Sequence, residues 1–409
     1  MTETELPSGT DRALLHHPGL IAFLSCRTLS SLGFQIQAVA IGWQAYSITH
    51  RPLTLGLIGL AQFLPMLALV FVSGQVADRF DRRRVAMVCQ VLEALCGLGL
   101  AWGTFRHLLT PGMIFGVVAL FGAAKAFEGP SLQAMLPSLV PASVFPKAAA
   151  LSSSLFQMAT IVGPSAGGLL YMAGPGKAYL VCTAMFVLAA IGMSLVRLES
   201  PPRPRGPITL ASVFGGLAFI RSRPQLLGAI SLDLFAVLLG GATALLPVYA
   251  LDILHGSPFW LGVLRGSPAI GALVVSLLLA RWPIRRHAGM LMFAAVFVFG
   301  LATIVFGISH WLPLSILAMA ILGAADVVSV LVRSTLVQIG TPEDMRGRVS
   351  AVNLLFIVTS NQLGEFESGS VAALIGTTQA VVVGGVGTLV IAGLWMRWFP
   401  ALRRLDRLT

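Results

Sequence analysis

Long apolar runs recur along the whole chain, and each is close to the roughly 20 residues that a helix needs to cross a hydrocarbon core of about 30 Å. Such repetition predicts a chain that crosses a membrane many times. The stretch before residue 18 is polar and the first run is long enough to stay in the membrane, so we expect no cleaved signal peptide. The pattern predicts an all-α integral membrane protein with twelve transmembrane helices, at residues 18–48, 54–76, 85–105, 111–134, 148–172, 177–197, 225–250, 258–280, 288–308, 311–334, 349–373 and 377–398.

A polar stretch divides these runs into two sets of six. ESPPRPRGP, at residues 199–207, is too rich in proline and arginine for a membrane helix and predicts a linker. ITLASVFGGLAFIRSR follows with apolar residues at helical spacing, which predicts a short helix lying in the membrane interface. The expected organisation is a cytoplasmic tail at 1–17, a six-helix bundle at 18–197, a cytoplasmic linker at 198–224, a second six-helix bundle at 225–398 and a basic cytoplasmic tail at 399–409.

The two sets also resemble each other in sequence, which favours an internal repeat. A shift of 201 positions pairs Lys147 with Arg348 and Gly163 with Gly364, and a shift of 203 aligns ADRFDRRR with ARWPIRRH. Both matches fall at corresponding places in the two sets. Two parallel six-helix repeats are the plan of major facilitator transporters, whose substrate site lies near the midplane between the halves. We therefore expect two pseudo-symmetric bundles.

Composition and charge agree with a membrane protein and set its orientation. Of 409 residues, 56% are hydrophobic and 11% charged, which leaves too little polar surface to cover a water-soluble globule. Most of the 27 lysines and arginines fall on the side of the termini, while Arg51, Arg106 and Lys177 fall on the other, so both termini are expected to be cytoplasmic. This bias explains the net charge of +11 without nucleic-acid binding, and the basic face should attract anionic lipid. The four cysteines lie inside predicted spans without CxxC spacing and predict neither a disulfide framework nor a zinc site.

The loop GQVADRFDRRR, Gly74 to Arg84, resembles the signature Gly-x-Leu-x-Asp-Arg-x-Gly-Arg-Arg of the major facilitator superfamily. Val76 replaces the leucine and Asp81 the second glycine. The physics of the loop fits, because an aspartate can face the positive N-terminus of another helix and the arginines hold the loop at an anionic leaflet. The alternative is an ordinary positive-inside loop. The resemblance implies a conformational latch between the halves, formed by Gly74, Asp78, Arg79, Arg82 and Arg83.

GPSAGG contains Gly-x-Ser-x-Gly, the spacing of a hydrolase nucleophile, with Ser165 at its centre. A serine nucleophile needs a histidine base, and all seven histidines fall in tails, loops or span ends, so we expect no enzyme activity. The string resembles instead the fifth-helix motif of superfamily exporters, Gly-x-x-x-Gly-Pro-x-x-Gly-Gly, with Ala159 in the first position. Small residues at this spacing let helices pack closely, and a proline bends the helix. The motif residues are Gly163, Pro164, Gly167 and Gly168, and in the family they mark export.

Ionisable residues inside the spans are the strongest functional clue, because each costs roughly 2.5–3.5 kcal/mol at a helix centre unless a partner or water offsets it. In the major facilitator fold, spans one, four, seven and ten line the central cavity. The charged residues expected on the substrate and proton pathway are Arg27, Lys125, Glu128, Asp233, Asp326 and Arg333, together with Glu365 in the eleventh span. Glu93, Arg265 and Glu367 are the other charged residues within spans.

Each of these charges has a structural alternative as part of an ion pair. Lys125 and Glu128 are three residues apart on one helix and can pair. Arg27 could instead meet Glu128 across the cavity, and Arg333 could serve either buried aspartate. A carboxyl group in a low-dielectric cavity holds a proton more readily, as a proton-coupled carrier requires. We therefore expect Asp233, Asp326 or Glu365 to carry the proton.

Within the superfamily, LGL at 55–57, the ADRFDRR loop, TPEDMRGRV at 341–349 and SNQLGEFESG at 360–369 resemble the branch that contains bacterial enterobactin exporters and related efflux proteins. The resemblance implies export of a hydrophobic or amphipathic small molecule, drug- or siderophore-like, across a bacterial inner membrane in exchange for protons. We expect a monomer that uses no cofactor or metal, and without a Walker A string ATP is not the driving force. A lipid or lysolipid translocator of the same fold, a hydrolase built on Ser165 and a non-transporting sensor remain open.

Overall fold

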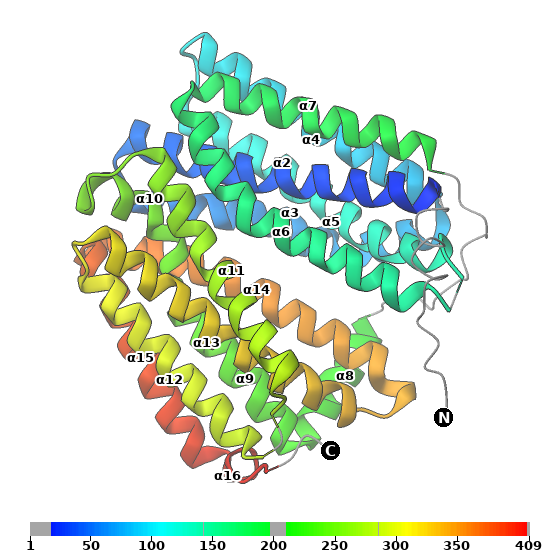
Figure 1. Ribbon diagram of the computed structural model, residues 1–409, viewed down its shortest axis with the longest axis vertical. Helices are drawn as coiled ribbons and strands as arrows, with labels where there is room; N and C mark the ends of the chain where they lie inside the picture. Colours follow the sequence, from blue (N-terminus) through cyan, green and yellow to red (C-terminus); the bar gives the residue numbers. More distant parts are fainter. Residues whose placement is uncertain (1–17, 142, 197–209, 285, 407–409) are drawn as a thin grey trace, which may run out of the picture.

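The computed structural model describes residues 18–141, 143–196, 210–284 and 286–406, and every regular element in these ranges is a helix. Figure 1 shows their arrangement. The long helices are α2 (Pro18–Thr49), α3 (Pro52–Arg79), α4 (Arg82–Phe105), α5 (Pro111–Met135), α6 (Phe145–Met172), α7 (Pro175–Leu195), α8 (Leu210–Ser222), α9 (Pro224–Leu239), α11 (Pro258–Arg281), α12 (Ala288–Ile308), α13 (Leu312–Ile339), α14 (Glu343–Ile375) and α15 (Thr377–Trp398).

Proline and capping residues set where many of these helices begin. Proline occupies the first or second position of α3, α5, α6, α7, α9, α11 and α13, where its missing N–H costs no internal hydrogen bond. The Thr110 hydroxyl caps α5 by accepting from the backbone N–H of Met113 (3.3 Å), and the Asp81 carboxylate caps α4 by accepting from that of Arg83 (3.0 Å). These local signals explain why the helix starts follow the predicted boundaries closely.

The predicted span at 225–250 is not one continuous helix. After α9 the chain continues through a 3₁₀ turn (Ala242–Leu245), a short helical turn α10 (Leu246–Val248) and a π-helical turn (Tyr249–Ile253). The break falls at Gly240 and Gly241, and glycine weakens a helix by about 1 kcal/mol relative to alanine. A Cβ at Gly241 would lie 2.6 Å from the carbonyl oxygen of Gly364, so α14 passes directly against this break.

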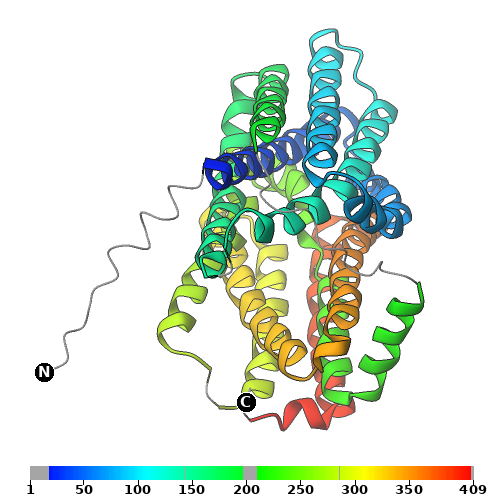
Figure 2. The ribbon, with the colours of Figure 1, turned by 90° about the vertical axis from the view of Figure 1, so that its right-hand side faces the viewer.

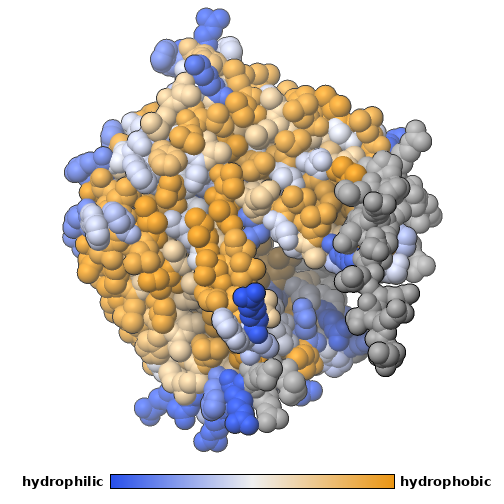
Figure 3. All heavy atoms as spheres, viewed as in Figure 1, coloured by the Kyte–Doolittle hydropathy of each residue, from blue (hydrophilic) through white to orange (hydrophobic). Residues whose placement is uncertain are grey.

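In the described ranges, ten helices are long and apolar enough to cross a membrane. The predicted spans at 148–172 and 349–373 correspond to α6 and α14, which are more polar and are not among the ten. Apolar side chains such as Leu277 and Leu195 are exposed over much of the outer surface, and Figure 3 shows hydrophobic residues over most of the visible face with hydrophilic ones near its margin. Such a surface suits lipid rather than water. The count of twelve spans stays a prediction.

The helices before residue 196 pack mainly on one another, as α4 on α7, α3 on α5 and α2 on both α6 and α7. Those after residue 209 do the same, as α11 on α13, α12 on α13 and α15, and α9 on α14. Figure 2 shows the earlier helices at one end of the view and the later ones at the other. The two groups meet along two seams, where α6 packs on α11 and α3 on α14. The predicted domain boundaries and pseudo-symmetry stay predictions.

Candidate functional site

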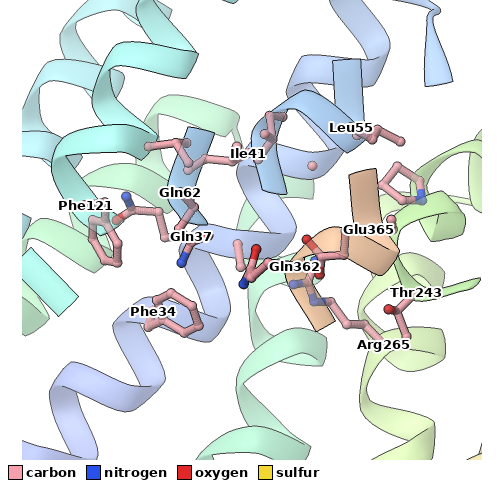
Figure 4. A pocket seen from close by; sticks show the side chains of 16 residues that line it. Phe34, Gln37, Ile41, Leu55, Gln62, Phe121, Thr243, Arg265, Gln362 and Glu365 are labelled. Atoms are coloured by element: carbon pink, nitrogen blue, oxygen red, sulfur yellow. The ribbon is translucent and has the colours of Figure 1, made fainter. Parts of the chain in front are cut away.

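A cavity of about 220 Å³ lies between the two groups of helices. On one side its walls come from α2, α3 and α5. On the other side they come from the turns that follow α9 and from the helices α11 and α14, so both groups contribute to it. Figure 4 shows that aromatic and aliphatic side chains share the wall with polar ones. The residues labelled there are Phe34, Gln37, Ile41, Leu55, Gln62, Phe121, Thr243, Arg265, Gln362 and Glu365.

Several polar groups in this wall lack partners within the described residues. Neither side-chain amide atom of Gln37 forms a hydrogen bond, although the residue is only 2% exposed, and Oε1 of Gln362 also has no donor. An unpaired buried polar atom costs about 1–3 kcal/mol, which water or a ligand recovers by bonding to it. The cavity therefore offers unused hydrogen-bonding capacity to a bound molecule.

Arg265 of α11 and Glu365 of α14 bring opposite charges to the same cavity, and the two groups attract one another. No ion pair joins them in the part of the chain that the structure describes. Gly59 of α3 makes room for the acid, since a Cβ there would lie 2.7 Å from Glu365 Oε2 and 3.0 Å from its Cβ. Sequence reasoning placed Glu365 on the pathway but left out Arg265, although its charge within a span was a usable signal.

A second cavity of about 390 Å³ extends along α2 toward its beginning and shares Phe34 with the first. Arg27, Lys125 and Glu128 all line it, as the sequence analysis expected of the pathway. Arg27 Nη1 donates to Ser152 Oγ of α6 (2.9 Å), and its charge is attracted to Glu128 without a described ion pair. The described hydrogen bond of Arg27 is therefore donated to the neighbouring helix α6 and not to Glu128.

Lys125 lies between two buried acids. Its Nζ pairs with Glu128 on the same helix, as their spacing allows, and with Glu93 Oε1 of α4 at 3.0 Å. Lys125 Nζ also donates to Ser30 Oγ (3.2 Å), and Ser30 Oγ donates to Glu128 Oε1 (2.8 Å). Sequence reasoning noted Glu93 as a buried charge but did not assign it to the pathway, because the third span is not expected to line the cavity.

A further charged cluster lies within the C-terminal group. Arg333 Nη1 is 3.0 Å from Asp233 Oδ2, and both side chains are almost fully buried. The same nitrogen donates to Asn353 Oδ1 of α14 (3.2 Å). Asp326 shares a small pocket with Asp233 and has no ion pair among the described residues. Of the two partners left open for Arg333, the structure selects Asp233, and none of these three charged residues lines the 220 Å³ cavity in this conformation.

The loop between α3 and α4 ties helices of one group together. Arg82 Nη1 donates to the carbonyl oxygen of Ala134 at the end of α5 (3.0 Å), and Arg83 Nη1 donates to that of Val196 after α7 (3.0 Å). Arg79 is exposed. The surroundings of Gly74 and the side chain of Asp78 are outside what the structure describes. The assignment of this loop as a latch stays a prediction.

The glycines of GPSAGG fix α6 between two partners. A Cβ at Gly163 would lie 2.6 Å from Gln35 Cβ of α2, and one at Gly167 would lie 2.9 Å from the carbonyl oxygen of Ile36. A Cβ at Gly168 would lie 2.7 Å from Phe259 Cα of α11. Across the seam, a Cβ at Gly262 would meet the backbone at Pro164. The string is therefore a helix-packing surface, and Ser165 lies within it.

The cavity is closed on the side away from the ends of the described chain. Apolar residues of both groups form one buried cluster there, including Trp43 and Leu55 on one side and Tyr249 and Leu261 on the other. The Tyr46 hydroxyl at the end of α2 donates to the carboxylate of Asp252, so one polar bond also crosses between the groups. Sequence reasoning did not find this contact, since neither residue stands out in its own segment.

The model of the transmembrane secretion effector family matches residues 14–408. The chain belongs to this family of the major facilitator superfamily. It is 27% identical over 395 residues to the enterobactin exporter EntS of Citrobacter koseri, covering 95% of this chain and 93% of that one. The same identity and coverage hold for the enterobactin exporter EntS of Escherichia coli O157:H7.

Solved transporters share the fold at low sequence identity. A bacterial homologue of the human lysosomal transporter Spinster, in an inward-facing and unoccupied conformation, matches with a TM-score of 0.75 at 14% identity, over 98% of this chain and 99% of that one. The nucleoside transporter NupG matches with a TM-score of 0.66 at 16% identity, over 92% of this chain and 99% of that one. The chain is thus a multi-pass membrane transporter, and its relatives are transporters rather than enzymes.

Proposed function

We propose that this transporter is a proton-coupled exporter of a hydrophobic or amphipathic small molecule, drug- or siderophore-like, which works by alternating access between two six-helix bundles. The observation that carries the proposal is the cavity to which both groups of helices contribute and which is sealed on one side. Rocking of the groups about their two seams would expose this cavity to the other side. The curated relatives, named as enterobactin exporters, support the direction and the substrate class.

The cavity wall fits such a substrate. Phe34, Phe121 and Ile41 offer apolar and aromatic contact, while Arg265 and Glu365 offer charge. Pockets that are mostly apolar with a few placed polar groups are typical small-molecule sites. The acids proposed to carry the proton remain Asp233, Asp326 and Glu365, and Glu365 is the one that lines this cavity.

The proposed setting is a bacterial inner membrane with both termini cytoplasmic, where the monomer works without cofactor or ATP. In that proposed orientation the sealed side would face outward, so the conformation described above would be the inward-facing one. A lipid or lysolipid translocator is the alternative and needs a cavity open sideways to the bilayer. The close backbone contacts at Gly262 and Gly168 of one seam, and at Gly56 and Gly369 of the other, favour the small-molecule exporter instead.

Everted membrane vesicles that contain the transporter test this proposal. An inside-acid gradient is imposed, and uptake of ethidium and of enterobactin is measured with and without a protonophore. We expect the protonophore to abolish uptake in the unaltered transporter. We also expect proton-driven uptake to be lost in the Glu365→Gln variant. The matched control is Glu343→Gln, which alters an exposed acid at the start of α14. Uptake that ignores the proton gradient, or that survives unchanged in Glu365→Gln, would contradict the coupling assigned to this cavity.

A further inference from the structure

The Lys125 cluster, formed by Lys125, Glu93 and Glu128, contains two acids but only one base that pairs with them. Glu93 is fully buried, Glu128 is 2% exposed, and both pair with the single ammonium of Lys125. The two carboxyl groups are neighbours, since both contact Ser30 Oγ as well as Lys125 Nζ. With both acids ionised, Lys125 and the two acids paired with it would bear one net negative charge, because Arg27 bonds to Ser152 and forms no described ion pair with either acid, and two neighbouring carboxylates would repel one another. Burying an uncompensated charge costs several kcal/mol.

The hydrogen bonds distinguish the two acids. Glu128 is fully supplied with donors, since Oε1 accepts from Ser30 Oγ (2.8 Å) and Gln90 Nε2 (3.3 Å) while Oε2 meets Lys125. Glu93 Oε1 lies 3.0 Å from Lys125 Nζ but accepts no hydrogen bond from the described residues, and Oε2 has only a long contact of 3.5 Å with Ser30. A well-solvated carboxylate keeps its charge, whereas a poorly solvated one takes up a proton. The geometry therefore favours Glu128 as the ionised acid and Glu93 as the protonated one.

A second observation points to the same proton. Gln90 is fully buried on α4, three residues before Glu93, and its amide is directed into the cluster by the bond to Glu128. Its other amide atom, Oε1, has no donor among the described residues. Buried acceptors rarely remain without a donor. The hydroxyl of a protonated carboxyl group is the kind of donor that the cluster lacks.

We propose that Glu93 and Glu128 form a carboxyl pair that binds one exchangeable proton beside Lys125, so that the N-terminal group holds a proton-binding site of its own. Glu128 and Lys125 line the 390 Å³ cavity, and Glu93 lies behind them. The proton enters from that cavity at Glu128 and rests on Glu93. The role of this proton-binding site in transport rests on the proposed proton coupling, whereas the existence of the site does not.

The other titratable groups around the pair are few. From α2, the charge of Arg27 acts on Glu128. From α4, the charges of both acids and of Lys125 act on Cys89, and that of Glu93 acts on Cys96. From α5 there is Lys125 itself. A cysteine does not take up a proton in the acidic range, and the two cations keep theirs, so the change in protonation belongs to the carboxyl pair.

Infrared difference spectroscopy on the purified full-length chain tests the site without any substrate. We expect the carbonyl stretch of a protonated carboxyl group to disappear as the pH rises, and to be smaller by one group in Glu93→Gln. Glu128→Gln should also lose it, because Glu93 then ionises against Lys125 alone, and this second variant decides the matter if the first does not fold. Glu343→Gln, at an exposed site, should leave it intact. A full-sized band in both cluster variants would overturn the proposal.

Transport separates this inference from the proposed function. In everted vesicles, Glu93→Gln should lose ethidium uptake driven by the proton gradient while keeping exchange of labelled for unlabelled ethidium without a gradient. Uptake in Glu93→Gln that is as proton-driven as in the unaltered chain would refute the coupling role. If the unaltered chain moves no ethidium, the proposed function fails for this probe, and the infrared result still decides whether the pair binds a proton.

Discussion

Replacing Gly168 with alanine should shift the transporter away from the sealed conformation. The added Cβ would meet the backbone of Pro258 and lie 2.7 Å from Phe259 Cα, across the seam between α6 and α11. Overpacking of this kind costs typically 1–3 kcal/mol. Because the clash is with the opposite group of helices, separation of the two groups relieves it. The cost should therefore fall on the sealed conformation and shift the ratio of conformations by roughly 5- to 150-fold.

The matched control is Gly99→Ala. A Cβ at Gly99 of α4 meets nothing within 4 Å, yet the change brings the same gain in helix propensity, about 1 kcal/mol. The readout is labelling of Thr243→Cys, placed in the cavity wall, by a maleimide that cannot cross the membrane and is added outside intact cells. The four native cysteines are buried and should give little background.

We expect several-fold faster labelling in the Gly168→Ala background and no change with Gly99→Ala. Equal labelling in the two backgrounds would show that the seam at Gly168 does not govern access to the cavity. Faster labelling in both would show that helix propensity, rather than the contact across the seam, changes the conformation.

Three further changes test other contacts. Tyr46→Phe removes the hydrogen bond to Asp252, and a hydrogen bond to a charged group contributes about 1.5–3 kcal/mol. Labelling of Thr243→Cys should therefore become at least tenfold faster. Unchanged labelling would show that this bond does not stabilise the sealed conformation. Arg333→Met leaves Asp233 buried and unpaired, which should cost about 3–5 kcal/mol in thermal unfolding, and adding Asp233→Asn should recover much of it, whereas no recovery would contradict the pairing. Gln37→Leu removes two unpartnered amide atoms and should raise thermal stability by about 1–3 kcal/mol while weakening ethidium uptake; lower stability would show that the amide has a partner.

The sequence was informative about helices because the signals that form them are local. The prolines that start α3, α5 and α11 stand at or near the predicted boundaries. The span predicted at 225–250 is long and apolar enough to cross a membrane, at Pro224–Ile253, but the sequence did not show that its helix breaks at Gly240 and Gly241, where α14 packs against it. The packing surface of GPSAGG was identified from its small residues, but its partners, α2 and α11, were not.

The candidate site was only partly accessible from sequence. The list of charged residues within spans already contained every ionisable residue of both buried clusters and of the cavity. It did not show that Lys125 forms ion pairs with two acids or that Arg333 pairs with Asp233. Nor did it show that Arg265 and Glu365 line the same cavity. Each of these relations, apart from the pair on α5, joins residues on different helices.

The sequence alone was enough to predict that this is a membrane protein and to place its helices approximately. It was also enough to indicate the transporter superfamily. These follow from run length, charge bias and short motifs, which are properties of neighbouring residues. The tertiary structure alone decided which acid meets which base, where the cavity lies and which side of it is sealed. Those depend on the rotation and register of helices far apart in the chain, because a shift of one residue turns a helical side chain by about 100° and toward a different neighbour.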